Sequence, residues 1–152
     1  MGRGWGFQAN GETTMNETET MLEMLGGREG APRTLAVVGL SDDPAKASHA
    51  VSAYMQEHGY RILPVNPGIA SALGEKSYAS LSELPVRPDV VNVFRLPKAI
   101  PAIVDEMLAL GLKNLWVQLG LRNEEAAAKA EAGGIRVVMD RCIMVEHRRL
   151  MR

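Results

Sequence analysis

Residues 35–41 read LAVVGLS, an apolar run that ends in a glycine. A continuous apolar run of this length is typical of a β-strand buried on both faces, as in a parallel sheet. The next residues, SDDP at 41–44, supply helix caps and a first-turn proline, which predicts a helix running to His58. Strand, glycine turn and helix together predict the first unit of an α/β fold.

The same alternation continues along the chain. Further apolar runs predict strands at 61–65, 90–94, 115–119 and 135–139, and the intervening patterns predict helices at 97–110, 123–132 and 145–150. The connections are too long for hairpins. We therefore expect a single doubly wound parallel five-stranded sheet of Rossmann type, with strand order 3-2-1-4-5 counted along the chain.

The N-terminal part differs from the rest. Residues 1–16 show no periodicity, which predicts a disordered tail, and residues 17–152 form the predicted domain. Within that domain, the amphipathic stretch at 17–25 predicts a short helix covering one edge.

Composition excludes several classes of function. The chain has 152 residues and a formal net charge of −1, so no overall field attracts nucleic acid or an acidic membrane. A single cysteine excludes an internal disulfide and a cysteine-based zinc site. Neither a secretory signal nor an apolar run of roughly 18 residues is visible, so we expect a cytoplasmic protein with no membrane or nucleic-acid partner.

Ligands of open parallel sheets bind outside the carboxyl ends of the strands, where the strand order reverses. With the expected order, this crevice lies between the first and fourth strands, facing residues 39–42 and 118–121. Gly39 permits close approach of the backbone, and Ser41, Ser48 and Lys46 add donors and charge near a helix N-terminus. These features predict a phosphate site. The alternative is a tight turn at Gly39 with Lys46 in solvent.

Two flanking loops refine this prediction. Asn66 and Pro67 follow the second strand, where an NAD site needs an acidic residue for the ribose hydroxyls. Phe94 and Arg95 end the third strand, and the Arg95 guanidinium suits a phosphate. A surface arginine paired with a carboxylate is the alternative for Arg95.

The remaining aromatic and titratable residues predict structural roles. Trp116 lies within a strand and is expected in the core. His58 stands at a helix end, where a cation favours the helix dipole, and His147 lies among charged residues on an expected solvated face.

Motifs at each strand end resemble those of the small bacterial CoA-binding domain proteins. They read AVVGLS at 36–41, PVNP at 64–67, VFR at 93–95, WVQLG at 116–120 and VMDRCI at 138–143. The resemblance covers residues 17–150. These proteins are similar to the CoA-binding domain of the succinyl-CoA synthetase α subunit, which has a Rossmann-type fold.

The resemblance implies a coenzyme A site. It places the phosphates or pantetheine against Gly39, Leu40 and Ser41, the nucleotide against Asn66, Pro67, Phe94 and Arg95, and the far wall at Gln118 and Gly120. Lys46 stands where the family commonly has arginine, and lysine lacks the guanidinium fork.

The resemblance further implies binding of coenzyme A or acyl-CoA without catalysis, because the chain shows neither the phosphorylatable-histidine domain nor the nucleotide-grasp partner of a ligase. A protein partner stays unidentified. The alternatives are an NAD(P)-binding oxidoreductase or redox regulator on the same fold, and a protein-interaction scaffold with a vestigial site.

Overall fold

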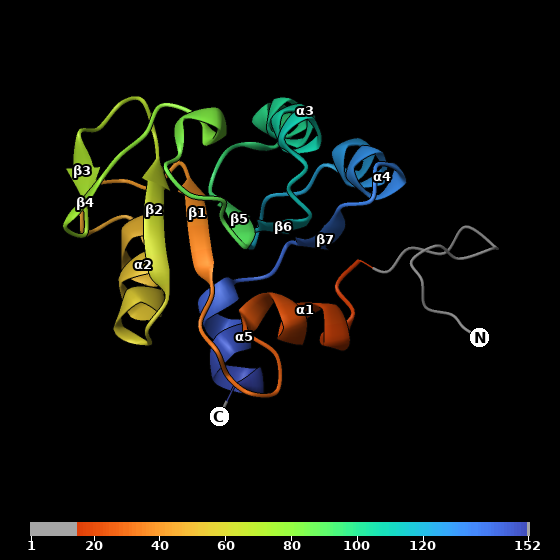
Figure 1. Cartoon of the computed structure of the whole chain (residues 1–152), viewed down its shortest axis with the longest axis horizontal. Helices are drawn as coiled ribbons and strands as arrows, with labels where there is room; N and C mark the ends of the chain where they lie inside the picture. The colour runs from red at the N-terminus through yellow and green to blue at the C-terminus, as the bar shows by residue number, and fades with distance from the viewer. Residues whose placement is uncertain (1–14, 152) are drawn as a thin grey trace.

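The computed structural model describes residues 15–151, so most of the predicted tail lies outside the described residues. Five strands form one parallel sheet in the order β2-β1-β5-β6-β7 (Figure 1). Their bounds are β1 (Thr34–Val38), β2 (Arg61–Val65), β5 (Val90–Val93), β6 (Asn114–Val117) and β7 (Arg136–Met139). The predicted α/β class and the single parallel sheet are confirmed.

The predicted strand order is wrong. Counted along the chain, the five strands run 2-1-3-4-5, because β5 pairs directly with β1, with Leu35 opposite Val90. Pro64 in β2 explains this arrangement, since proline cannot donate to a second neighbour and suits an edge strand. The outer side of β2 is instead met by Tyr78, whose N–H donates to Pro64 O at 3.0 Å. The strand order therefore reverses between β1 and β5.

Residues 66–89 connect β2 to β5 without an α-helix. They contain the two-residue strands β3 (Ser71–Ala72) and β4 (Glu75–Lys76) and the 3-10 helix η1 (Leu81–Glu83). The antiparallel β3–β4 pair lies beside β2, outside the main sheet (Figure 1). This short connection carries the chain across to the far side of β1.

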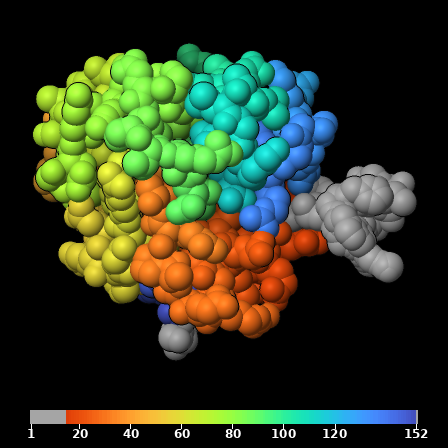
Figure 2. Space-filling view, in the orientation of Figure 1, coloured from red at the N-terminus to blue at the C-terminus, as the bar shows by residue number. Residues whose placement is uncertain are grey.

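Helices cover both faces of the sheet, as a doubly wound fold requires. One face carries α1 (Thr18–Leu25), α2 (Ala47–Glu57) and α5 (Ile143–Leu150), and the other carries α3 (Ile100–Leu110), which follows the 3-10 helix η2 (Pro97–Ala99), and α4 (Glu124–Ala132). Each face of the sheet packs against its helices in a separate hydrophobic core. Leu35 and Val37 of β1 point into the core with α1, α2 and α5, and Ala36 and Val38 point into the core with α3 and α4. Figure 2 shows the orange N-terminal segment packed against segments far away in the sequence.

The N-terminal segment covers the β7 side of the sheet. Met21, Met24 and Leu25 of α1 are buried in the core that α5 shares. Asn16, assigned to the predicted tail, pairs with β7: its N–H donates to Val137 O at 3.2 Å, and its side chain bonds both the N–H and the carbonyl of Met139. An edge strand is thereby protected from further pairing.

Trp116 and His147 are both buried, and only one of them was predicted to be. Trp116 is fully buried, as predicted, and its Nε1–H donates to Arg141 O at 2.9 Å. His147 is only 7% exposed, so its predicted solvated position is wrong. It lies on the inner side of the amphipathic helix α5, against α2. Within residues 15–151, no helix is long and apolar enough to cross a membrane.

Candidate functional site

Gly39 lies where the strand order reverses. Its φ of +91° is a conformation that side chains disfavour, and a Cβ there would lie 2.5 Å from Phe94 O. Its N–H donates to Val65 O at 2.9 Å, while the N–H of Phe94 donates to Val38 O at 2.8 Å. The ends of β2, β1 and β5 therefore meet at Gly39 with backbone against backbone.

Two hydroxyl groups follow Gly39, one from Ser41 on the loop and one from Ser48 in the first turn of α2. Ser48 Oγ accepts a hydrogen bond from the Ser41 N–H at 3.0 Å, and Ser41 Oγ accepts one from the Asp43 N–H at 3.0 Å. Each hydroxyl is held by a backbone donor and keeps its own proton to donate. The bond from the Ser41 N–H to Ser48 Oγ thus ties the loop after Gly39 to the start of α2.

Helix α2 begins later than predicted. Asp43 caps a turn, with its Oδ1 accepting from the Ala45 N–H at 2.9 Å, so the helix starts at Ala47 and Lys46 takes the N-cap position. No acidic residue lies in the first turn. The unpaired N–H groups and the Lys46 ammonium therefore place positive charge at the same end of α2.

Asn66 links the loop of β1 to the end of β5. Its Nδ2 donates to Leu40 O at 3.0 Å, and its Oδ1 accepts from the Gly68 N–H at 2.8 Å and from Arg95 Nη2 at 3.4 Å. A carboxylate at position 66 could not donate to Leu40 O. The Asn66 side-chain amide thus stabilises this loop. It occupies the position where an NAD site would have an acidic residue to bind the ribose hydroxyls.

Arg95 lies beside Gly39, with its Nε 3.2 Å from where a Gly39 Cβ would stand. It is half-buried, and no carboxylate pairs with it within residues 15–151. The bond to Asn66 uses only one of its five N–H donors. The guanidinium therefore has several donors left for an anion at this crevice.

Other predicted residues lie differently from what the sequence suggested. The Leu40 side chain is fully buried, so only its backbone can face a ligand. Phe94 is partly buried and packs against the same core, and Pro67 is exposed. Phe94 and Arg95, rather than residues of the β6 loop, lie directly across from Gly39, because β5 is the neighbour of β1.

Gln118 lies one strand further from Gly39 than expected. It is buried, and its Oε1 accepts from Asn92 Nδ2 and from the Ile143 N–H, both at 3.1 Å. Its Nε2 has no hydrogen-bond partner among the described residues, so both of its N–H donors stay available. Asn92 was missed by the sequence analysis, although an asparagine inside the run VVNV is a visible signal of a buried polar contact.

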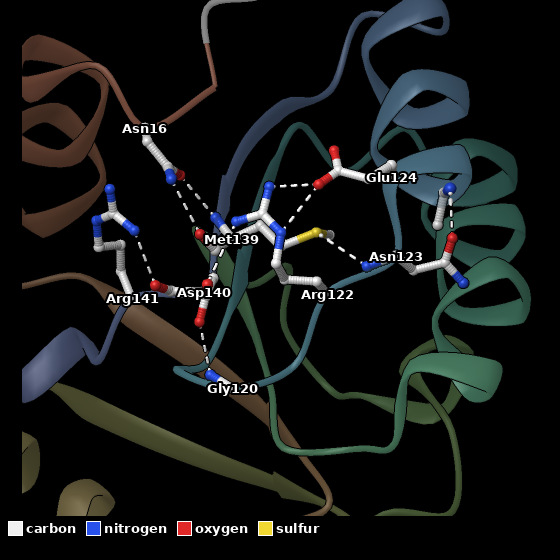
Figure 3. A network of polar contacts seen from close by, with 9 residues as sticks. Asn16, Gly120, Arg122, Asn123, Glu124, Met139, Asp140 and Arg141 are labelled. Carbon is white, nitrogen blue, oxygen red and sulfur yellow. Dashed lines mark hydrogen bonds and ion pairs between the residues drawn. The ribbon is translucent and has the colours of Figure 1, made fainter.

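Gly120 faces away from Gly39, toward β7. Its N–H donates to Asp140 Oδ1 at 2.7 Å, and Asp140 also pairs with Arg122, which in turn binds Glu124 (Figure 3). The bond from the Gly120 N–H, with help from Arg122, holds the pKa of Asp140 below its usual range. This network fixes the loop after β6 and leaves the Gly120 N–H occupied.

The structure therefore assembles one site from three neighbouring strands. Hydrogen bonds join the Gly39 loop to Ser48 and to Asn66, and Asn66 to Arg95, while Lys46 stands exposed at the start of α2. Nearly every functional group is a hydrogen-bond donor or a cation, which suits a ligand rich in phosphate oxygens. No cluster that could hold a metal ion is found among the described residues.

Comparisons with known proteins identify the family of the chain. Residues 33–148 match the family described as "CoA binding domain". The chain is 47% identical over 115 residues to the uncharacterized protein YneT of Bacillus subtilis, covering 76% of this chain and 85% of that one. It is 27% identical over 123 residues to the α subunit of ADP-forming acetate–CoA ligase II of Pyrococcus furiosus, covering 74% of this chain but only 27% of that subunit.

Solved structures share the fold over most of the chain. A hypothetical protein from Pyrococcus horikoshii superposes with a TM-score of 0.83 at 35% identity, covering 93% of this chain and 99% of that one. Protein ID.343 of Thermus thermophilus gives a TM-score of 0.75 at 43% identity, with coverages of 78% and 90%. On the match over residues 33–148, the chain belongs to the CoA binding domain family.

Proposed function

We propose that the chain binds coenzyme A or an acyl-CoA in the crevice between the carboxyl ends of β1 and β5, without catalysing a reaction itself. The observation that carries this proposal is Arg95, a half-buried guanidinium with no carboxylate partner among the described residues. Asn66 holds it beside Gly39, where an added Cβ would clash with Phe94 O. Family membership supports the identity of the ligand.

The ligand's parts fit the site in order. The diphosphate lies against Gly39, Ser41 and the N-terminus of α2, where N–H groups and the helix dipole favour an anion. The adenosine end lies over Asn66 and Pro67 at the end of β2. Arg95 and Lys46 supply charge for the remaining phosphate, and the pantetheine crosses β5 toward the free Nε2 of Gln118.

The chemistry of the groups favours binding over catalysis. The described residues of the crevice contribute hydroxyls, amides, a guanidinium and an ammonium, all of them donors. No hydrogen-bonded pair of a nucleophile and a base is found among these crevice residues. Such a pair is what covalent or general-base catalysis requires.

Calorimetric titration of the purified protein with coenzyme A, dephospho-CoA and NAD tests the proposal. We expect coenzyme A to bind, dephospho-CoA to bind more weakly, and NAD to give no heat. Arg95→Ala is expected to weaken coenzyme A binding about tenfold or more, because a charge-assisted hydrogen bond of about 1.5–3 kcal/mol is lost. Arg61→Ala, at the other end of β2, serves as the matched control.

Two outcomes would contradict the proposal. Equal binding of coenzyme A by Arg95→Ala and Arg61→Ala would remove Arg95 from the site. Binding of NAD(P) with no binding of coenzyme A would favour the oxidoreductase alternative.

A further inference from the structure

A second cavity, of about 420 Å³, lies at the opposite end of the sheet. Its walls include Arg28, Pro32, His58, Tyr60, His147 and Leu150, drawn from the loop after α1, the end of α2 and helix α5. Figure 1 shows that loop passing beside the end of α5. Pro32 and Gly39 lie at opposite ends of β1, roughly 20 Å apart at about 3.3 Å per residue. The cavity is therefore separate from the crevice, and its volume falls within the range of small-molecule sites.

One tyrosine holds both histidines of the cavity. Tyr54 Oη bonds His147 Nδ1 at 2.8 Å, and His58 Nδ1 donates to Tyr54 O at 2.8 Å. The two imidazole rings are 5.0 Å apart, centroid to centroid, and Arg148 lies over the Tyr54 ring. Neither Nε2 atom has a hydrogen-bond partner within residues 15–151, although His147 is only 7% exposed. The Nε2 of this largely buried side chain is therefore accessible from the cavity and has no hydrogen-bond partner among the described residues.

No carboxylate forms an ion pair with either imidazole within residues 15–151. Burial, and then the neighbouring His58, lower the pKa of His147, so the empty cavity disfavours its proton. Burial raises the pKa of Tyr60 to about 12, and its hydroxyl donates to Leu25 O rather than accepting a proton from histidine. An anion in the cavity beside His147 would favour its imidazolium form, because opposite charges favour the charged form.

The surrounding charges leave room for such an anion. Glu29 is the one carboxylate among the described lining residues, and it is exposed on the loop. Arg28 pairs with the exposed Glu19 at 2.8 Å, a contact that solvent screens. Glu146, on the same helix as His147, is engaged by Arg149 at 2.6 Å.

Part of the cavity wall is apolar, contributed by Leu22, Pro32, Leu150 and Met151. An inorganic phosphate would leave this surface uncovered, whereas an organic acid would bury it. We propose that the cavity binds a small carboxylic acid with an apolar body, its carboxylate held by protonated His58 and His147 beside Arg28. Binding favours the protonated form of His147, so it strengthens as the pH falls.

Titration with sodium benzoate tests this site, followed by calorimetry and by the NMR signals of the histidine rings. We expect binding at pH 6 that shifts both the His58 and His147 signals, and binding at least tenfold weaker at pH 8. The neutral isostere benzamide is expected to bind at least tenfold more weakly at pH 6. His58→Asn, an exposed position at the end of α2, is expected to weaken benzoate binding about tenfold. The control is His49, in the first turn at the other end of α2, and His49→Asn is expected to leave benzoate binding unchanged.

The proposal is overturned if benzoate causes no shift of the two ring signals, if benzamide binds as well as benzoate, or if His58→Asn binds like wild type. Competition by coenzyme A would also overturn it, because benzoate would then occupy the crevice. Since the two sites lie at opposite ends of the sheet, failure here leaves the coenzyme A proposal untouched.

Discussion

Gly39→Ala is expected to damage both the fold and the crevice. At a φ of +91°, a side chain costs about 1–2 kcal/mol. The added Cβ would also lie 2.5 Å from Phe94 O, a backbone atom fixed between paired strands. Relieving that overlap adds about 1–3 kcal/mol, as other overpacked sites do. We therefore expect a loss of about 2–5 kcal/mol in the free energy of unfolding.

Gly74→Ala supplies the matched control. Gly74 also has a positive φ, +78°, but nothing lies within 4 Å of its Cβ position. Both variants carry the cost of a side chain at positive φ, and only Gly39→Ala carries the cost of the overlap with Phe94 O. In urea denaturation, Gly39→Ala should therefore be less stable than Gly74→Ala by about 1–3 kcal/mol. Equal stability of the two variants would refute the argument that β1 and β5 approach too closely for a side chain. Coenzyme A binding should be lost in Gly39→Ala and retained in Gly74→Ala.

Three further predictions concern polar groups. Asn92→Ala leaves Gln118 Oε1 with one donor fewer in the core and is expected to cost about 1–3 kcal/mol by urea denaturation; no loss would contradict the buried network. Folding lowers the pKa of Asp140, so the ionised carboxylate stabilises the protein at a pH above its pKa in the unfolded chain. This contribution is lost as the pH falls through the pKa of the folded protein. Wild type should therefore exceed Asp140→Asn in stability at pH 7, and the difference should vanish in acid; a difference independent of pH would contradict the role of the charge. His147 also has a lowered pKa, so the unfolded chain binds the proton more readily and His147 destabilises the protein as the pH falls below 6.5. An NMR titration midpoint below 6.5, raised by His58→Asn, is expected, and a midpoint at or above 6.5 would contradict the burial argument.

Apolar runs were sufficient to predict the five strands of the sheet, because a strand buried on both faces needs an uninterrupted run. The strand order was wrong although one residue carried the signal: Pro64 favours an edge, and the predicted order placed its strand between two others. The start of α2 was missed because Asp43 caps a turn as readily as a helix.

The site was predictable only in part. Gly39, Ser41 and Asn66 could be placed together because parallel strands end at one edge. Gln118 could not be placed, since its role depends on bonds to Asn92 and to the start of α5, which only packing brings together. The histidine pair was missed for the same reason, because α2 and α5 meet only in the folded chain.

Amide NMR spectra recorded during addition of coenzyme A test the central claim most directly. The account predicts that the largest shifts fall on Gly39, Ser41 and Ser48 and on the Arg95 side chain, with little change around His58. Shifts that spare Gly39 and Arg95 while concentrating elsewhere on the sheet, or no shifts at all, would contradict the assignment of the crevice between β1 and β5 as the coenzyme A site.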